Sequence, residues 1–131
     1  MLLEPYAGWS LFKIDDFEFP ISYLTDVPQD FTDAFLYGLS HGICSVTMDG
    51  EDKGDCLLVM NMFDCYTIQN KSNNYTLDNN IIIKRFEIDM HTLAEKFIKD
   101  IERHEEAWAN WQLWEEPCLP YNLNKLKELL P

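Results

Sequence analysis

Few side chains in this sequence have the types and spacing that catalysis or metal binding requires. His41 and Cys44 are a base and a thiol in one segment, but a glycine lies between them and the pair is too close in sequence for a nucleophile and its base. His91 and Glu95 are one helical turn apart, yet no second histidine or cysteine completes a zinc set. His104 lies on an apolar helical stripe, where we expect a hydrogen-bonded core histidine. We therefore expect no enzymatic activity, no cofactor and no bound metal.

One acidic turn invites comparison with a calcium-binding loop. Asp49, Glu51 and Gly54 fall at positions one, three and six of such a loop. Lys53 and Met60, however, occupy positions five and twelve, where calcium requires oxygen ligands. We expect an exposed acidic tip instead. The glycine-rich motifs that cradle phosphate are also missing from the sequence.

The acids are concentrated in the first half of the chain. Residues 1–64 carry twelve acids against two bases, a net charge of −10, whereas residues 65–131 carry eleven against eight, a net charge of −3. A field of that sign repels nucleic acid and anionic lipid and attracts basic proteins. The alternative is that the acids only maintain solubility. From charge alone, we expect nine acids to contact a protein partner: Asp15, Asp16, Glu18, Asp30, Asp33, Asp49, Glu51, Asp52 and Asp55.

Composition and the cysteines point to a reduced, cytoplasmic protein. The first five residues have neither a basic start nor a signal-peptide apolar run, and no window approaches the ~20 apolar residues of a membrane span. Cys44, Cys56, Cys65 and Cys118 show no C-x-x-C pairing, so we expect reduced and mostly buried thiols.

The strongest structural signal is a strand over 81–88 that passes into a helix from about 90 to 114. The strand begins with three β-branched residues and then alternates Arg85 and Glu87 with Phe86 and Ile88, as a strand that enters from a buried position would. The helix is predicted by apolar residues at helical spacing, and either Asp89 or a capping box of Thr92 and Glu95 can begin it. We expect this stripe to enter the core: Leu93, Phe97, Ile101, Trp108 and Trp111.

Shorter elements complete the predicted fold. A hairpin around Asp15 and Asp16 is possible, and a second hairpin joins a strand over 43–48 to a strand-rich region over 55–68. Residues 56–62 carry apolar side chains on both faces, as in a central strand covered on two sides. Helices are expected at about 28–39 and 121–130. We predict a single α+β domain over 1–131, an antiparallel meander of three to five strands packed against one long helix.

The order of these elements resembles a family of bacterial inhibitors. Together with the segments 9–12 (Trp-Ser-Leu-Phe) and 28–31 (Pro-Gln-Asp-Phe) and the strand-to-helix passage at Ile88 and Asp89, it is similar to the immunity proteins of polymorphic toxin and contact-dependent growth inhibition systems. The resemblance covers most of the chain. It implies a one-to-one complex with a cognate toxin domain, often a basic nuclease, whose active site or substrate groove is covered. No binding residue of the family can be placed on this sequence.

Two other classes of function remain open. An intracellular adaptor or regulatory domain would explain the same acidic surface without a toxin. A small hydrolase using Cys44 or His104 is the enzyme alternative.

Overall fold

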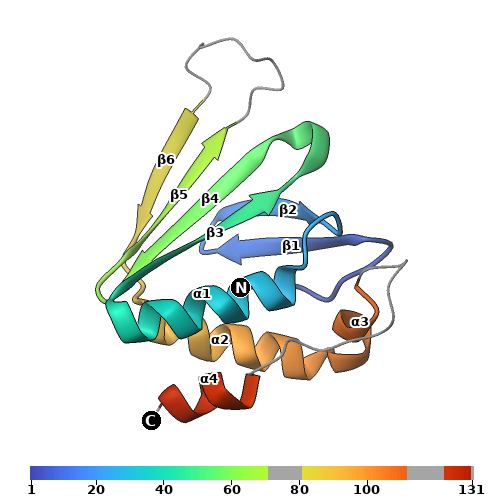
Figure 1. The fold of residues 1–131 in the computed structure, drawn as a ribbon. Helices are drawn as coiled ribbons and strands as arrows, with labels where there is room; N and C mark the ends of the chain where they lie inside the picture. Colours follow the sequence, from blue (N-terminus) through green and yellow to red (C-terminus); the bar gives the residue numbers. More distant parts are fainter. Residues whose placement is uncertain (71–80, 112–122, 131) are drawn as a thin grey trace.

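The strands form two antiparallel sheets in the computed structural model, which describes residues 1–70, 81–111 and 123–130 (Figure 1). The smaller sheet pairs β1 (Trp9–Ile14) with β2 (Phe17–Ser22). The larger sheet is a meander in the order β3 (Ile43–Asp49), β4 (Asp55–Asn61), β5 (Cys65–Asn70) and β6 (Ile81–Phe86), with a 3-10 turn, η1 (Glu51–Lys53), between β3 and β4. The helices are α1 (Val27–His41), α2 (Met90–Arg103), α3 (Glu105–Ala109) and α4 (Leu123–Leu129). The predicted α+β class and the hairpin around Asp15 and Asp16 are confirmed.

Two helices of similar length take the place of the one long helix that the sequence predicts. α1 has 15 residues and α2 has 14. α2 begins where expected, because the Asp89 side chain accepts a hydrogen bond from the Thr92 backbone N–H at 2.7 Å and caps the helix. It ends at Arg103, since His104 has φ −128° and ψ 47°, outside the helical region, and the chain then restarts as α3. The prediction of one helix as far as residue 114 is therefore wrong, and residues 112–114 lie outside the described residues.

The predicted apolar stripe nevertheless forms the centre of the core. All five of its members are buried, Trp108 and Trp111 included. The ring of Phe97 on α2 packs against Phe31 and Phe35 of α1, with centroid distances of 5.6 and 5.5 Å. The indole of Trp111 also donates a hydrogen bond to the carbonyl of Thr25 at 2.8 Å, which ties the end of α3 to the loop before α1.

Glycines set the end of α1 and its close packing. Gly42, with φ 90°, ends the helix in the left-handed conformation, and its N–H donates to the carbonyl of Gly38 at 2.7 Å. Gly38 lies inside the helix, where a Cβ would be 2.6 Å from Met90 Sδ and 2.7 Å from Cys44 Sγ. The absence of a side chain at this position allows α1 to approach both α2 and β3.

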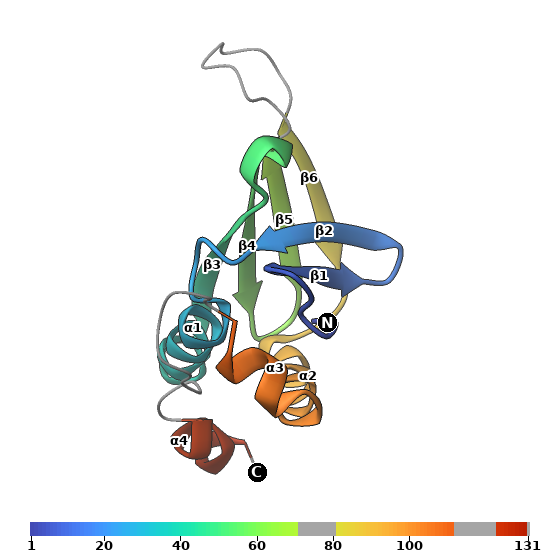
Figure 2. The same ribbon diagram turned by 90° about the vertical axis from the view of Figure 1, so that its right-hand side faces the viewer.

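The larger sheet has one face in the core and one face that no described element covers. The β1–β2 hairpin lies across the core face (Figure 2), where Phe17 contacts Phe86 of β6 with ring centroids 5.9 Å apart. Along β4, Cys56, Leu58 and Met60 are buried on this face, whereas Leu57 and Val59 on the other face are only partly buried. The prediction that this strand is covered on both sides is therefore wrong.

β6 also differs from its prediction. It is the last strand of the sheet among the described residues, and Ile81, Ile82 and Ile83 are 59%, 36% and 63% exposed. The predicted buried strand is thus an edge strand, because the hairpin covers only its Phe86 end.

The C-terminal helix docks on the core as predicted. Leu126 of α4 is fully buried, and Lys127 Nζ lies 3.0 Å from Glu102 Oε1 of α2. None of the helices in the described part of the chain combines the length and apolar character needed to cross a bilayer.

Candidate protein-binding groove

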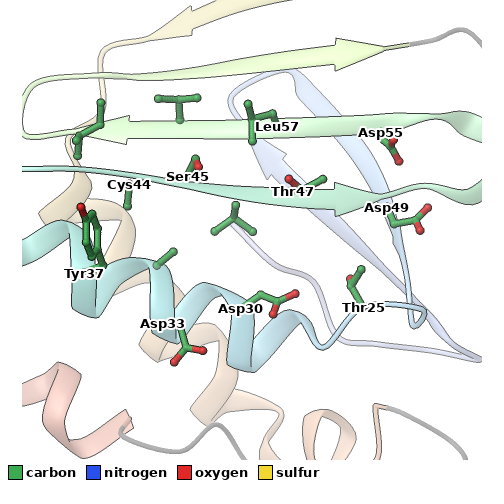
Figure 3. Close-up of a pocket in the computed structure, with 14 residues that line it drawn as sticks. Thr25, Asp30, Asp33, Tyr37, Cys44, Ser45, Thr47, Asp49, Asp55 and Leu57 are labelled. Atoms are coloured by element: carbon green, nitrogen blue, oxygen red, sulfur yellow. The ribbon is translucent and has the colours of Figure 1, made fainter.

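A groove of about 960 Å³ runs between α1 and the strands β3 and β4 (Figure 3). We call it the acidic groove, because four carboxylates line it: Asp30 and Asp33 of α1, Asp49 of β3 and Asp55 of β4. Asp49 and Asp55 lie at one end of the groove and Tyr37 lies at the other (Figure 3). No Lys, Arg or His is among the described residues that line it.

Like charges lie near one another at two places along the groove. Asp49 and Asp55 are directly opposite each other in the β3–β4 register. Like charges in such a cross-strand pair destabilise a sheet. The pKa of Asp30 is raised, first by burial and then by the charges of Asp26 and Asp33. The groove therefore has a negative potential that the lining residues do not neutralise.

A buried hydroxyl lies at the acidic end of the groove. Thr25 Oγ1 has no hydrogen-bond partner among the described residues, although it is buried. A hydroxyl can both donate and accept, so Thr25 is able to pair with a polar group that enters the groove.

The open face of the sheet continues the groove as an apolar surface. Strand register places Thr47, Leu57, Ile68 and Ile83 opposite one another, so that they form one row across all four strands. We call these four residues the open-face row. Three of the four are aliphatic, and contiguous apolar surface of this kind is what a partner protein can cover.

Exposed aromatic and aliphatic side chains lie at the other end of the groove. Tyr37 and Ile43 are 57% and 54% exposed. The Tyr37 ring stacks on His41 with a centroid distance of 4.1 Å, which restricts its rotation. Aromatic side chains with restricted motion lose little entropy on binding, and Tyr is enriched among the residues that dominate interface energies.

The turn between β4 and β5 presents a further aromatic residue at this end of the sheet. Phe63 is 85% exposed. The turn that holds it is fixed from within, because Asn61 Oδ1 accepts hydrogen bonds from the backbone N–H groups of Phe63 and Asp64 at 2.8 and 2.9 Å. Asp64 in turn accepts from Arg85 Nε of β6 at 2.6 Å, and Arg85 and Asn61 lower its pKa. Phe63 is thus an exposed ring on a rigid support.

The nine acids that charge alone selected do not form one surface. Four of them line the acidic groove, and Glu51 and Asp52 lie in the exposed turn η1 beyond its acidic end. The other three, at 15, 16 and 18, belong to the β1–β2 hairpin, whose turn lies near β6, at the opposite edge of the larger sheet from α1 and β3 (Figure 2). Glu18 also pairs with Lys13 at 3.5 Å. The nine acids therefore lie in two separate parts of the surface, and which of them contact a partner stays a prediction.

The sequence reasoning missed the apolar part of this surface. Tyr37, Ile43 and Phe63 stand alone in the sequence, and nothing local distinguishes them from core residues. A usable signal was present in residues 56–62, which are apolar at alternate positions that the fold does not bury.

The thiols and the histidines are held in other interactions. Cys44, Cys56 and Cys65 are free and buried, as predicted, and Cys118 lies outside the described residues. Burial raises the pKa of Cys44 to about 11, so its thiol is protonated at neutral pH. Its Sγ contacts Met90 Sδ at 3.9 Å, while His41 Nδ1 lies 2.9 Å from the carbonyl of Tyr37. The two side chains are not arranged as a nucleophile and its base.

His104 is not the core histidine that the sequence predicts. Its side chain is 30% exposed, and its Nδ1 lies 3.7 Å from Glu4 Oε2. The end of α2 at this residue turns it toward the surface. In the part of the chain that the structure describes, no three His, Cys, Asp or Glu side chains are grouped so as to hold a metal ion.

Comparisons with protein-family models, with curated proteins and with solved structures found no match to this chain.

Proposed function

We propose that this chain is an acidic immunity protein that binds a basic toxin domain, foremost a nuclease, in the cytoplasm and covers its active site or substrate groove. The observation that carries the proposal is that four acids, from α1, β3 and β4, line one groove that no described base lines. A nuclease must present positive charge to phosphate. A protein with the opposite charge in a groove competes for that same surface and is steered to it rapidly.

The arrangement of the acids favours binding over simple solubility. Acids that only maintain solubility can be spread over a surface, and spreading them lowers their repulsion. Asp49 and Asp55 are instead paired across two strands. Asp30 lies near two other acids, the N-cap residue Asp26 and Asp33 of the same helix, and its pKa is raised by burial and then by their charges. A cationic partner relieves the repulsion between Asp49 and Asp55 and the repulsion around Asp30. The stability that this repulsion costs the free protein is then recovered in the complex.

The apolar surface beside the groove offers the contacts that slow the dissociation of a complex. Electrostatic complementarity mainly increases association rates, whereas a slow dissociation rate requires well-packed apolar contacts. Tyr37 and Phe63 are suited to that role because both are exposed and both are held in place by their neighbours.

The first experiment identifies the partner. The chain is tagged and purified from its native host, and the proteins that accompany it are identified by mass spectrometry. The recovered partner is then expressed in a sensitive strain with and without this chain. We expect a toxic partner whose toxicity the chain removes. A partner without toxicity would refute the immunity function and favour the adaptor alternative, for which the same groove would serve.

The second experiment tests the groove. The double variant Asp49→Ser/Asp55→Ser and the matched control Asp15→Ser/Asp16→Ser each lose two negative charges. We expect the groove variant to associate with the partner about tenfold more slowly at low salt and the control to change much less, with the difference shrinking as salt rises. Equal rates for the groove variant and the unmodified chain at low salt would exclude the groove as the contact surface.

A further inference from the structure

We propose that the outer edge of β3 binds an extended, cationic segment of the partner as an additional strand, seated in the acidic groove. The identity of the partner rests on the proposed function, but the binding mode has its own basis in the geometry of β3.

The groove runs along the edge of β3 and not only over one of its faces. Consecutive residues from Ile43 to Thr47 line it. Cys44 and Val46 point toward the core face, whereas Ser45 and Thr47 point toward the open face. A cavity lined by side chains from both faces of a strand must run along the edge of that strand, where backbone N–H and C=O groups point outward. Figure 3 shows this edge facing α1 across the groove, with Cys44 and Ser45 on opposite sides of the strand.

The backbone of this edge is available for pairing. β3 is the terminal strand of its sheet, and within the described residues its backbone hydrogen bonds as a strand go to β4. Edge strands are commonly protected by Lys, Pro or a bulge. Residues 43–48 contain no Lys and no Pro. β6, at the other edge, carries Lys84 and Arg85, so the two edges differ in protection.

Charge and length define the occupant. Asp30 and Asp33 stand on the α1 side of the groove and Asp49 and Asp55 at its end. A segment that fits must therefore carry Lys or Arg. The seven residues of β3 extend over about 23 Å at ~3.3 Å per residue, which corresponds to a partner segment of about five to seven residues. Strand addition of this kind takes its affinity from main-chain hydrogen bonds and its specificity from alternate side chains.

The test uses synthetic peptides, so that it does not depend on the toxin. The probe is the fluorescein-labelled peptide Lys-Val-Lys-Val-Lys-Val-Lys. The control has the same sequence with N-methyl groups on every residue, which keep every charge and remove the backbone N–H donors of both strand edges. Fluorescence anisotropy gives the affinities, and amide hydrogen exchange shows which strand is protected. We expect the N-methylated peptide to bind about five- to tenfold more weakly, since it cannot form the ladder hydrogen bonds, and only the parent peptide to slow exchange in β3.

Matched variants separate the groove from the overall charge. Asp30→Asn/Asp33→Asn is expected to weaken binding of the parent peptide by about fivefold or more, and Asp15→Asn/Asp16→Asn by less than twofold. Equal affinity for the two peptides, or slower exchange at β6 in place of β3, would overturn strand addition. Equal effects of the two double variants would overturn the groove as the site.

The failure of this inference can be told from a failure of the proposed function. If the parent peptide protects β3 but the groove variants leave toxin association unchanged, the strand site stands and the immunity function at that site falls. If the toxin needs the groove acids but the two peptides bind equally, the immunity function stands and strand addition falls.

Discussion

Replacing Asp55 with asparagine is expected to stabilise the free protein and to weaken its complex. Asp55 lies directly opposite Asp49 in the β3–β4 register. Cross-strand pairs contribute roughly 0.2–1 kcal/mol, and like charges in that position are destabilising. Because Asp55 is exposed, solvent screening places the expected gain at about 0.2–0.5 kcal/mol. Asparagine keeps the shape of the side chain, and the hydrogen bond from Glu51 N to Asp49 Oδ1 in the neighbouring turn is left in place.

Urea unfolding is the appropriate assay, because urea adds no ions. With an m-value of about 2 kcal/mol/M, the unfolding midpoint of Asp55→Asn should rise by about 0.1–0.3 M in low salt. In about 1 M NaCl, where the Debye length is ~3 Å, the gain should disappear. The association rate with the basic partner should fall in the same low-salt buffer. Asp16→Asn, which removes the same charge from the β1–β2 turn, is the control.

Two results would refute this reasoning. A lower midpoint for Asp55→Asn would mean that the carboxylate has a structural role. A gain that persists unchanged in 1 M salt would mean that repulsion from Asp49 is not its source.

Three further outcomes are expected. Phe63→Ala should change the free energy of unfolding by less than ~0.5 kcal/mol, since the ring is 85% exposed. The same variant should dissociate faster from the partner in surface plasmon resonance. An unchanged dissociation rate would show that Phe63 is not in the interface. The pKa of Asp64 is lowered, first by its hydrogen bond with Arg85, so this carboxylate contributes stability above the unfolded pKa of ~3.9 and loses it as the pH falls through the folded value. Asp64→Asn should therefore make the free energy of unfolding, measured by urea titrations between pH 7 and pH 2.5, depend less on pH at the acid end. An unaltered pH dependence would contradict the lowered pKa. Gly38→Ala should destabilise by about 1–3 kcal/mol through overpacking against Met90, despite the better helix propensity of alanine, and a higher melting temperature in calorimetry would show that the contact relaxes freely.

Local signals predicted where α1 and α2 begin. The α2 start follows from Asp89, whose carboxylate caps the helix, and α1 follows from Pro28 and the acids of its first turn. The sequence predicts that α1 ends at about residue 39. In the structure α1 ends two residues later, at His41, where Gly42 forms the C-cap. These features depend on a few neighbouring residues, so they can be found without the tertiary fold.

Coverage of the sheet could not be predicted in the same way. The apolar run 56–62 suggested burial on both faces, and the isoleucines of 81–83 suggested a buried strand. Whether a strand face is covered depends on where the β1–β2 hairpin docks, which contacts far apart in the sequence decide. The end of α2 at His104 likewise had no local signal, because the apolar spacing continues past it to Trp108 and Trp111.

The candidate site was only partly predictable, because it too depends on contacts between residues far apart in the sequence. Charge counting selected Asp30, Asp33, Asp49 and Asp55, and all four line the acidic groove. It selected the hairpin acids equally, although the fold places them at the other edge of the sheet. A count of charges does not say where each acid lies in the fold, so only the structure can tell the acids that line the groove from those that do not.

The hydrogen bond from Trp111 to Thr25 gives the protein an internal optical reporter. Thr25 lines the acidic groove, and the indole that holds its carbonyl lies 5.1 Å, centroid to centroid, from the ring of Trp108. Indole emission responds to the strength of its N–H hydrogen bond, and two indoles this close couple in circular dichroism. A segment that enters the groove and moves the Thr25 loop should therefore change the intrinsic spectrum of the unlabelled chain.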